Sequence, residues 1–217
     1  MKAQRWRLFF AKTEAMRFTS HLDLILAWER TFRRSGLPLS YSEGFNPRPV
    51  INLAAPLPLG FTSSGEIGDF WLSELVSENT FSSSIKDSLP PGLEILSLKE
   101  IPQLHGNKLP SLTHSAVYWM KLNHPIDELP IRIKEILSAK SIPRVRKGKE
   151  YDLRPIIHKL TLIPTGSTGV ITLETELSLQ PGSTGRPEEV LNVLGIPPHE
   201  ALIQRTMINL KSIILES

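Results

Sequence analysis

One helix of this sequence has a start and a stop that the residues themselves indicate. Ser20 is a favourable N-cap, and Asp23 stands three positions later, where a capping box places an acidic or amide side chain. Gly36 and Pro38 end the helix, because glycine readily adopts the left-handed C-cap and proline cannot continue a helix. Apolar residues recur between these limits and predict a stripe that faces a core: Leu22, Ile25, Leu26, Trp28 and Phe32.

The segments around this helix predict a βαββαβ order for an N-terminal lobe of residues 1–101. Strands are expected where aromatic and β-branched residues gather or where apolar and polar residues alternate. A cluster of proline and glycine ends the second helix. The expected elements are a strand at 5–12, the helix from Ser20, strands at 50–55 and 66–73, a helix at 80–89 and a strand at 93–101.

Residues 102–113 have no periodicity and are rich in turn-forming residues, so they are expected to be a linker. Residues 114–217 repeat the first pattern as a C-terminal lobe. The fold class is therefore α+β, with tandem ferredoxin-like (βαββαβ) lobes built on antiparallel sheets. The second lobe is expected to contain a strand at 115–122, a helix at 126–139, strands at 153–162 and 169–177, a helix at 187–194 and a strand at 201–215.

Composition excludes several kinds of chemistry. The 217 residues include no cysteine, which removes disulfides, thiolate metal sites and cysteine nucleophiles. The six histidines show no H-x-x-x-H spacing, so we expect neither a metal nor another cofactor. The longest apolar runs are too short to span a bilayer, and the N-terminus lacks the features of a signal peptide. A cytoplasmic protein is expected.

Basic residues are concentrated in two segments. Residues 1–50 hold nine Lys and Arg against four acids, a balance of +5, although the whole chain carries only +3. Residues 140–160 hold seven against two, again +5. Two positive segments on an acidic background favour a polyanionic ligand, with RNA the leading candidate, whereas a single basic segment is commonly just a solvated surface.

The start of the predicted helix is one candidate site. His21 and Asp23 lie in its first turn, where unpaired backbone N–H groups favour an anion. Asp23 can instead cap the helix, and His21 can be a structural histidine. If the protein is an enzyme, His21, Asp23 and Glu43 are the candidate catalytic residues, with Arg48 stabilising negative charge.

The loop Tyr41-Ser42-Glu43-Gly44-Phe45-Asn46-Pro47-Arg48-Pro49 is the second candidate site. Its rings can stack on bases and Arg48 can bind phosphate. In the alternative interpretation, the rings cover a sheet edge and the glycine and prolines shape a turn. A single site requires this loop to fold back against His21. The anion-binding set would comprise His21, Arg30, Arg34, Tyr41, Ser42, Phe45, Asn46 and Arg48.

A basic hairpin or loop in the second lobe is the third candidate. Arg144, Arg146, Lys147 and Lys149 lie within six residues and precede a predicted strand. They can hold a nucleic-acid backbone, or they can form a solvated loop.

The stretch FTSHLDLILAWERTFRRSGLPLSYSEGFNPRP resembles the radical SAM-associated protein family, a domain of unknown function. Its members are encoded beside, or fused behind, a radical SAM protein. The similarity is close over residues 5–75 and looser beyond. It implies a radical SAM enzyme as partner, which would bring the Cys-ligated cluster that this chain cannot hold. Arg48 departs from the family, which often has histidine there. The family's recurring polar positions correspond here to Ser20, His21, Asp23, Arg30, Arg34, Tyr41, Ser42, Gly44, Phe45, Asn46 and Pro47.

Three functions follow from these observations. The first is an RNA-binding or substrate-presenting accessory protein of a radical SAM enzyme, working in RNA modification and lacking activity alone. The second is a metal-independent RNA-cleaving or other hydrolytic enzyme that uses His21. The third is a protein–protein adaptor that binds no nucleic acid.

Overall fold

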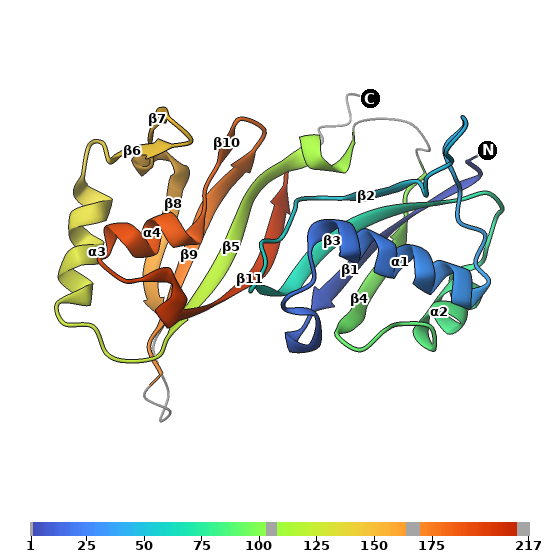
Figure 1. The fold of residues 1–217 in the computed structure, drawn as a ribbon, viewed down its shortest axis with the longest axis horizontal. Helices are drawn as coiled ribbons and strands as arrows, with labels where there is room; N and C mark the ends of the chain where they lie inside the picture. Colours follow the sequence, from blue (N-terminus) through green and yellow to red (C-terminus); the bar gives the residue numbers. More distant parts are fainter. Residues whose placement is uncertain (1, 103–107, 164–169, 212–217) are drawn as a thin grey trace. The chain divides into compact units, whose positions relative to one another are not determined.

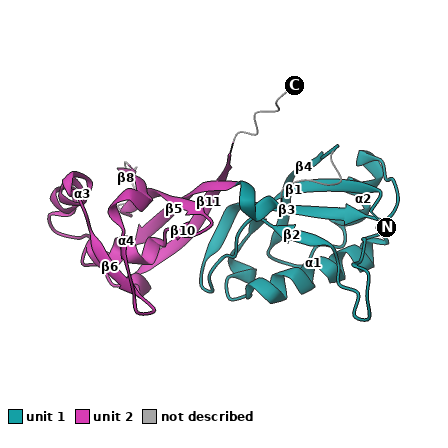
Figure 2. Cartoon of the chain, turned by 90° about the horizontal axis from the view of Figure 1, so that it is seen from above, with its two compact units in different colours: residues 1–112 teal, residues 113–217 magenta. Residues whose placement is uncertain are grey.

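The computed structural model describes residues 2–102, 108–163 and 170–211. The chain divides into two compact units, unit 1 from Met1 to Leu112 and unit 2 from Thr113 to Ser217 (Figure 2). The expected α+β class is confirmed, because the described residues form four α-helices together with strands that pair antiparallel within each unit.

Unit 1 contains the elements expected from the sequence, displaced by a few residues at their ends. Its four strands lie in the order β2-β3-β1-β4, and each neighbouring pair is antiparallel (Figure 1). The elements are β1 (Gln4–Lys12), α1 (His21–Ser35), β2 (Ile51–Leu53), β3 (Thr62–Leu72), α2 (Glu78–Lys86) and β4 (Leu93–Glu100), with short 3-10 helices η1 (Glu14–Met16) and η2 (Leu109–Leu112).

Both helices of unit 1 pack on one face of this sheet. Alternation along β1 places Trp6, Leu8 and Phe10 on that face, where all three are buried. Trp28 of α1 lies at the centre, with its ring centroid 5.0 Å from Phe10 and 4.9 Å from Phe70. The resulting core also takes in α2, through aromatic contacts of Phe81 with Trp6 and Phe32.

The predicted core stripe of α1 is wrong in two of its members. Leu22 and Leu26 are 71% and 45% exposed, whereas Leu24, which the prediction omitted, is buried. Leu24, Trp28 and Phe32 are spaced by four residues and therefore share one face. Leu22 lies about 200° around the helix from Leu24, which turns it toward solvent.

Three basic residues of the N-terminal segment lie inside unit 1. Arg5 and Arg7 both bond the buried carboxylate of Asp69, with Arg7 bidentate at 2.7 and 2.9 Å. Lys12 is fully buried, and its Nζ donates to the backbone carbonyls of Arg17 and Thr19 at 3.2 and 3.1 Å. The positive charge of residues 1–50 is therefore only partly available to a ligand.

Unit 2 places β5 between β11 and β9, while β8 and β10 pair with the other edge of β9. An additional hairpin, β6–β7, is inserted between α3 and β8 (Figure 1). The elements are β5 (Thr113–Leu122), α3 (Leu129–Ser138), β6 (Pro143–Arg146), β7 (Lys149–Asp152), η3 (Arg154–Ile156), β8 (Ile157–Ile163), β9 (Thr172–Gln180), β10 (Ser183–Thr184), α4 (Pro187–Val193), η4 (Pro198–Glu200) and β11 (Ala201–Leu210).

Part of the segment expected to be a linker is buried. Leu109 and Leu112, within its second half, are buried in η2, and η2 contacts β2. Residues 103–107 of that linker lie outside the described residues, as do 212–215 of the expected last strand.

Candidate nucleic-acid interface

The residues that the sequence singles out occupy three places in the structure. His21, Asp23, Arg30 and Arg34 lie on α1. Tyr41 to Arg48 lie within the connection between α1 and β2, and we call this segment the 41–48 loop. Arg144, Arg146, Lys147 and Lys149 lie in the β6–β7 hairpin of unit 2.

The first turn of α1 has the capping arrangement that the sequence predicts. Ser20 Oγ accepts a hydrogen bond from the backbone N–H of Asp23 at 3.2 Å and donates to Asp23 Oδ2 at 2.6 Å. His21 is the first residue of the helix and is half-buried. Asp23 therefore supports the helix start directly, which leaves less of its carboxylate available for proton transfer.

A cavity of 320 Å³ lies beside α1. Asp23, Leu26, Arg30 and Arg34 line it, because these side chains share one face of the helix, and Pro90 lies across from them. Arg34 is held in place, since its Nη2 donates to the carbonyl of Ser88 at 2.5 Å. The Arg30 side chain makes no hydrogen bond or ion pair with the described residues and is exposed, so it is the cation of this cavity that can meet a ligand.

The 41–48 loop is an ordered turn. Ser42 and Arg48 close its base, since the Ser42 N–H donates to the Arg48 carbonyl at 2.8 Å and the Arg48 N–H donates to Ser42 Oγ at 3.0 Å. Tyr41 also pairs with Pro49 as an isolated bridge. Phe45 lies at the tip, 106% exposed, so the loop presents a complete aromatic ring to solvent.

The loop is attached to the second half of α1. Tyr41 Oη donates to Glu29 Oε1 at 3.2 Å. Partial burial, together with the Glu29 carboxylate, raises the pKa of the Tyr41 phenol, while nearby Arg33 acts in the opposite direction. Tyr41, Glu29 and Arg33 therefore form the junction between loop and helix.

The expectation that this loop folds back against His21 is not met. The loop rises beside the end of α1, and His21 begins the helix at its other end (Figure 1). Glu29 already lies eight residues beyond His21, a rise of about 12 Å along the helix. The loop is set there because Gly36, with φ of 70°, turns the chain at the C-terminal end of α1. Glu43 and His21 are consequently not brought together as a catalytic pair.

The β6–β7 hairpin turns at Lys147 and Gly148, whose φ values of 49° and 74° are both positive, as a type I′ turn requires. Cross-strand pairing places Arg144 beside Tyr151 and Arg146 beside Lys149, all on one face of the hairpin. Arg144 is bound to Glu189 of α4 at 3.1 Å and thus has a structural partner. The side chains of Arg146, Lys147 and Lys149 make no hydrogen bond or ion pair with the described residues.

Tyr151 marks the contact between this hairpin and α4. Burial and the Glu189 carboxylate raise the pKa of its phenol, and Arg144, Arg146 and Arg186 oppose the shift. Tyr151 and Arg186 were not predicted as part of the basic site. Arg186 is 37 residues beyond Lys149 in the sequence, so only the fold could bring it to the hairpin.

A polar cluster in unit 2 was also not predicted from the sequence. Glu174 accepts from Lys159 at 2.8 Å and from the Trp119 indole at 3.0 Å, which together lower the pKa of its carboxyl. Glu176 accepts from Ser115 at 2.5 Å and from Asn209 at 3.2 Å. Glutamates at alternate positions of one strand were the available signal. This acidic sheet face would repel phosphate.

Within residues 2–102, 108–163 and 170–211, no three His, Asp or Glu side chains gather closely enough to hold a metal ion. The same part of the chain contains no helix of the length and apolar character needed to cross a membrane.

Comparison with curated proteins finds no match. A family model does match, over residues 5–187, and its description is "Uncharacterized protein conserved in bacteria". The matched range includes α1, the 41–48 loop and the β6–β7 hairpin. The chain therefore belongs to this bacterial family, DUF2344.

Proposed function

We propose that this protein binds RNA in the cytoplasm and presents it to a radical SAM enzyme that modifies it. The single observation on which the proposal rests is the ring of Phe45, which an ordered loop holds fully exposed. A solvent-exposed ring contributes no core packing, whereas the same ring can stack on an unpaired base.

Positive charge near the loop supports the choice of ligand. Arg48 closes the base of the loop through its backbone, so its exposed guanidinium stays available for phosphate. Arg33 of α1 is also exposed and lies near Tyr41. An aromatic ring with arginines beside it suits a single-stranded nucleic acid, because stacking holds the bases while the cations hold the backbone.

The β6–β7 hairpin supplies a second set of cations. Arg146, Lys147 and Lys149 remain available, whereas Arg144 is paired with Glu189. We infer that these three side chains contact phosphates without reading sequence.

The radical SAM partner is supported by sequence resemblance. The S-H-L-D helix start and the Y-S-E-G-F-N-P loop carry that resemblance. The description of the matched family names no partner and no activity.

We also infer that both units are ferredoxin-like. In unit 1 the βαββαβ order gives the strand order β2-β3-β1-β4. In unit 2, without the β6–β7 insertion, the same chain order gives β8-β9-β5-β11, which is the equivalent arrangement. Sheets of this kind serve many functions, so this inference adds nothing to the choice of ligand.

Fluorescence anisotropy with a labelled single-stranded RNA of mixed sequence tests the proposal. Phe45→Ala is expected to weaken binding by about 5- to 150-fold, because stacking contributes about 1–3 kcal/mol per base. Arg33→Ala and Arg48→Ala are each expected to lower by about one the number of counterions released on binding. This number is given by the slope of the logarithm of the affinity against the logarithm of the salt concentration.

Phe18→Ala is the matched control, since Phe18 is also an exposed ring, 76% exposed, but precedes the other end of α1. It should leave the affinity for RNA unchanged. RNA binding that is absent at low ionic strength, or that is unaffected by Phe45→Ala, would refute the proposal.

An enzyme of the hydrolytic kind is less well supported. It needs His21 to work with a second group, and the arrangement at the helix start offers Asp23, which is bonded to Ser20. An RNA-cleaving activity that His21→Ala abolishes would favour this alternative over simple binding.

A further inference from the structure

Strand β4 leaves one edge of the unit 1 sheet unpaired among the described residues. β4 pairs with β1 on its inner side and ends the strand order of this unit. Its outer backbone N–H and C=O groups are therefore available to another strand. No proline interrupts residues 93–100, so nothing in the sequence of the strand removes a backbone donor.

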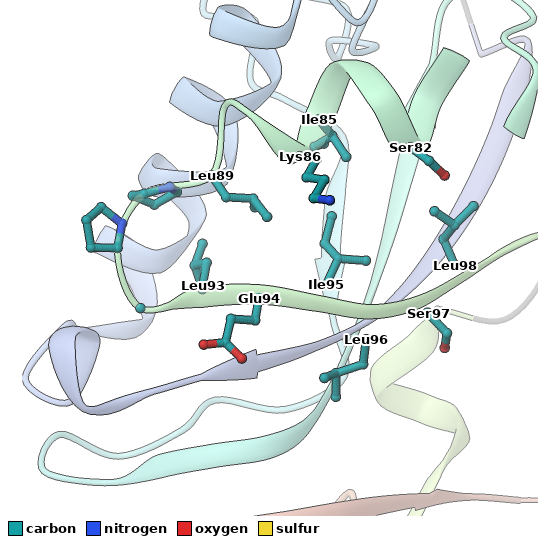
Figure 3. Close-up of a pocket in the computed structure, with 13 residues that line it drawn as sticks. Ser82, Ile85, Lys86, Leu89, Leu93, Glu94, Ile95, Leu96, Ser97 and Leu98 are labelled. Atoms are coloured by element: carbon teal, nitrogen blue, oxygen red, sulfur yellow. The ribbon is translucent and has the colours of Figure 1, made fainter. Parts of the chain in front are cut away.

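A cavity of 730 Å³ runs along this edge, between β4 and α2. Leu93, Ile95 and Leu98 point into it from the strand, and Ile85 and Leu89 approach from the helix side (Figure 3). Glu94, Leu96 and Ser97 point to the opposite side of the strand (Figure 3). An apolar cavity beside an unpaired strand edge suits a partner that supplies both a backbone to pair and apolar side chains to bury.

The pairing with β1 fixes which residues share a face. Trp6, Leu8 and Phe10 oppose Glu100, Leu98 and Ile95, so these β4 residues lie on the helix-covered face. Arg7, Phe9 and Ala11 oppose Lys99, Ser97 and Glu94, which lie on the other face. Leu96 has no opposite residue, because the register shifts between Phe9 and Phe10, and it is the extra residue of a bulge.

This order of residues is complementary to itself. We consider an antiparallel pair of β4 strands centred on Ser97 and related by a two-fold axis perpendicular to the sheet. With Leu96 left out of the pairing in each copy, as the bulged residue, this pair opposes residues of the same face. Glu94 then lies opposite Lys99 of the other copy, twice by symmetry. Ile95 lies opposite Leu98 of the other copy on the cavity side. Opposite charges and apolar pairs at facing positions both stabilise a sheet.

Neighbouring registers lose this match. Centring the pair on Ile95 places Glu94 opposite Ser97, which removes both ion pairs. Centring the pair on Leu98 places Ile95 opposite Glu100, so that a carboxylate faces an apolar side chain. Only the register centred on Ser97 satisfies the charges and the apolar residues together.

We propose that the protein forms a two-fold symmetric dimer through β4, with a second copy of the chain pairing edge to edge in the register centred on Ser97. Such an interface is isologous, so each substitution acts at two symmetric positions. The proposal does not depend on RNA binding, and the loop and hairpin that we assign to RNA are not part of this edge.

Sedimentation equilibrium of nuclease-treated full-length protein tests the dimer. The wild-type protein is expected to sediment as twice the 24.4 kDa chain at micromolar concentration. Glu94→Lys and Lys99→Glu should each weaken the dimer by about tenfold or more, because each turns two attractive pairs into two repulsive ones. The double variant Glu94→Lys/Lys99→Glu should restore the wild-type dissociation constant, since it exchanges the charges without changing the match.

Lys121→Glu provides the matched control, because Lys121 is an exposed strand lysine of β5 in unit 2. It should leave the dimer intact. Circular dichroism and the thermal midpoint check that the exposed positions 94 and 99 tolerate the substitutions. A wild-type protein that remains monomeric at 100 µM, or a double variant that does not recover the dimer, would overturn the proposal.

Discussion

Two backbone hydrogen bonds link the charge state of Asp152 to the stability of the fold. Asp152 Oδ1 accepts from the backbone N–H groups of Ile142 at 2.7 Å and Arg154 at 2.9 Å, and these two hydrogen bonds lower the pKa of the carboxyl below its ordinary value of 3.8. A lowered folded-state pKa means that the carboxylate stabilises the fold above the ordinary value. That stabilisation is lost as the pH falls through the lowered value.

We therefore expect Asp152→Asn to lower the thermal midpoint at pH 7, and we expect the difference from wild type to shrink progressively below about pH 4. Thermal unfolding followed by circular dichroism between pH 2 and pH 7 measures both effects. Glu150→Gln is the control, because Glu150 is an exposed carboxylate on the same strand. A difference that persists unchanged at pH 2 would contradict the assignment.

At the scale of the element, α1 depends on its N-cap. Ser20→Ala removes the acceptor of the Asp23 N–H and should lower the free energy of unfolding by about 1 kcal/mol. Urea unfolding measures this change, and Ser20→Asp should lose much less because aspartate also caps well. RNA affinity should stay the same in both variants, since the 41–48 loop contacts the other half of the helix. A selective loss of affinity in Ser20→Ala would place the RNA site at the helix start.

At the scale of the whole molecule, the question is whether basic residues of both units bind one RNA. If they do, Lys147→Ala with Lys149→Ala should reduce the salt dependence of binding by about two ions relative to wild type. Lys159→Ala should change it little, because Lys159 is already paired with Glu174. Titrations of the same RNA at several salt concentrations give the slopes. Equal slopes for wild type and the double variant would exclude the β6–β7 hairpin from the interface.

Much of the secondary structure and part of the site were predictable from sequence because the signals are local. A cap, a turn or an alternation of apolar residues depends on neighbours within a few positions, so Ser20, Gly36 and the strand at residues 5–12 could be recognised directly. The exposure of the loop at residues 41–48 follows from its glycine and prolines in the same way. The core stripe of α1 was only partly predictable, because Leu22, Leu24 and Leu26 are equally apolar and differ only in the direction they face.

The sequence by itself determined where α1 begins and ends and which segments carry basic residues. Only the tertiary structure decided which of those bases are available to a ligand. Arg5 meets Asp69 across 64 positions of the chain, and Lys12 meets the carbonyl of Phe61 across 49. Burial of a charge is stable only where distant groups compensate it. Those distant partners come together only when the sheet forms. In the same way, only the tertiary structure decided that the 41–48 loop contacts Glu29 and not His21.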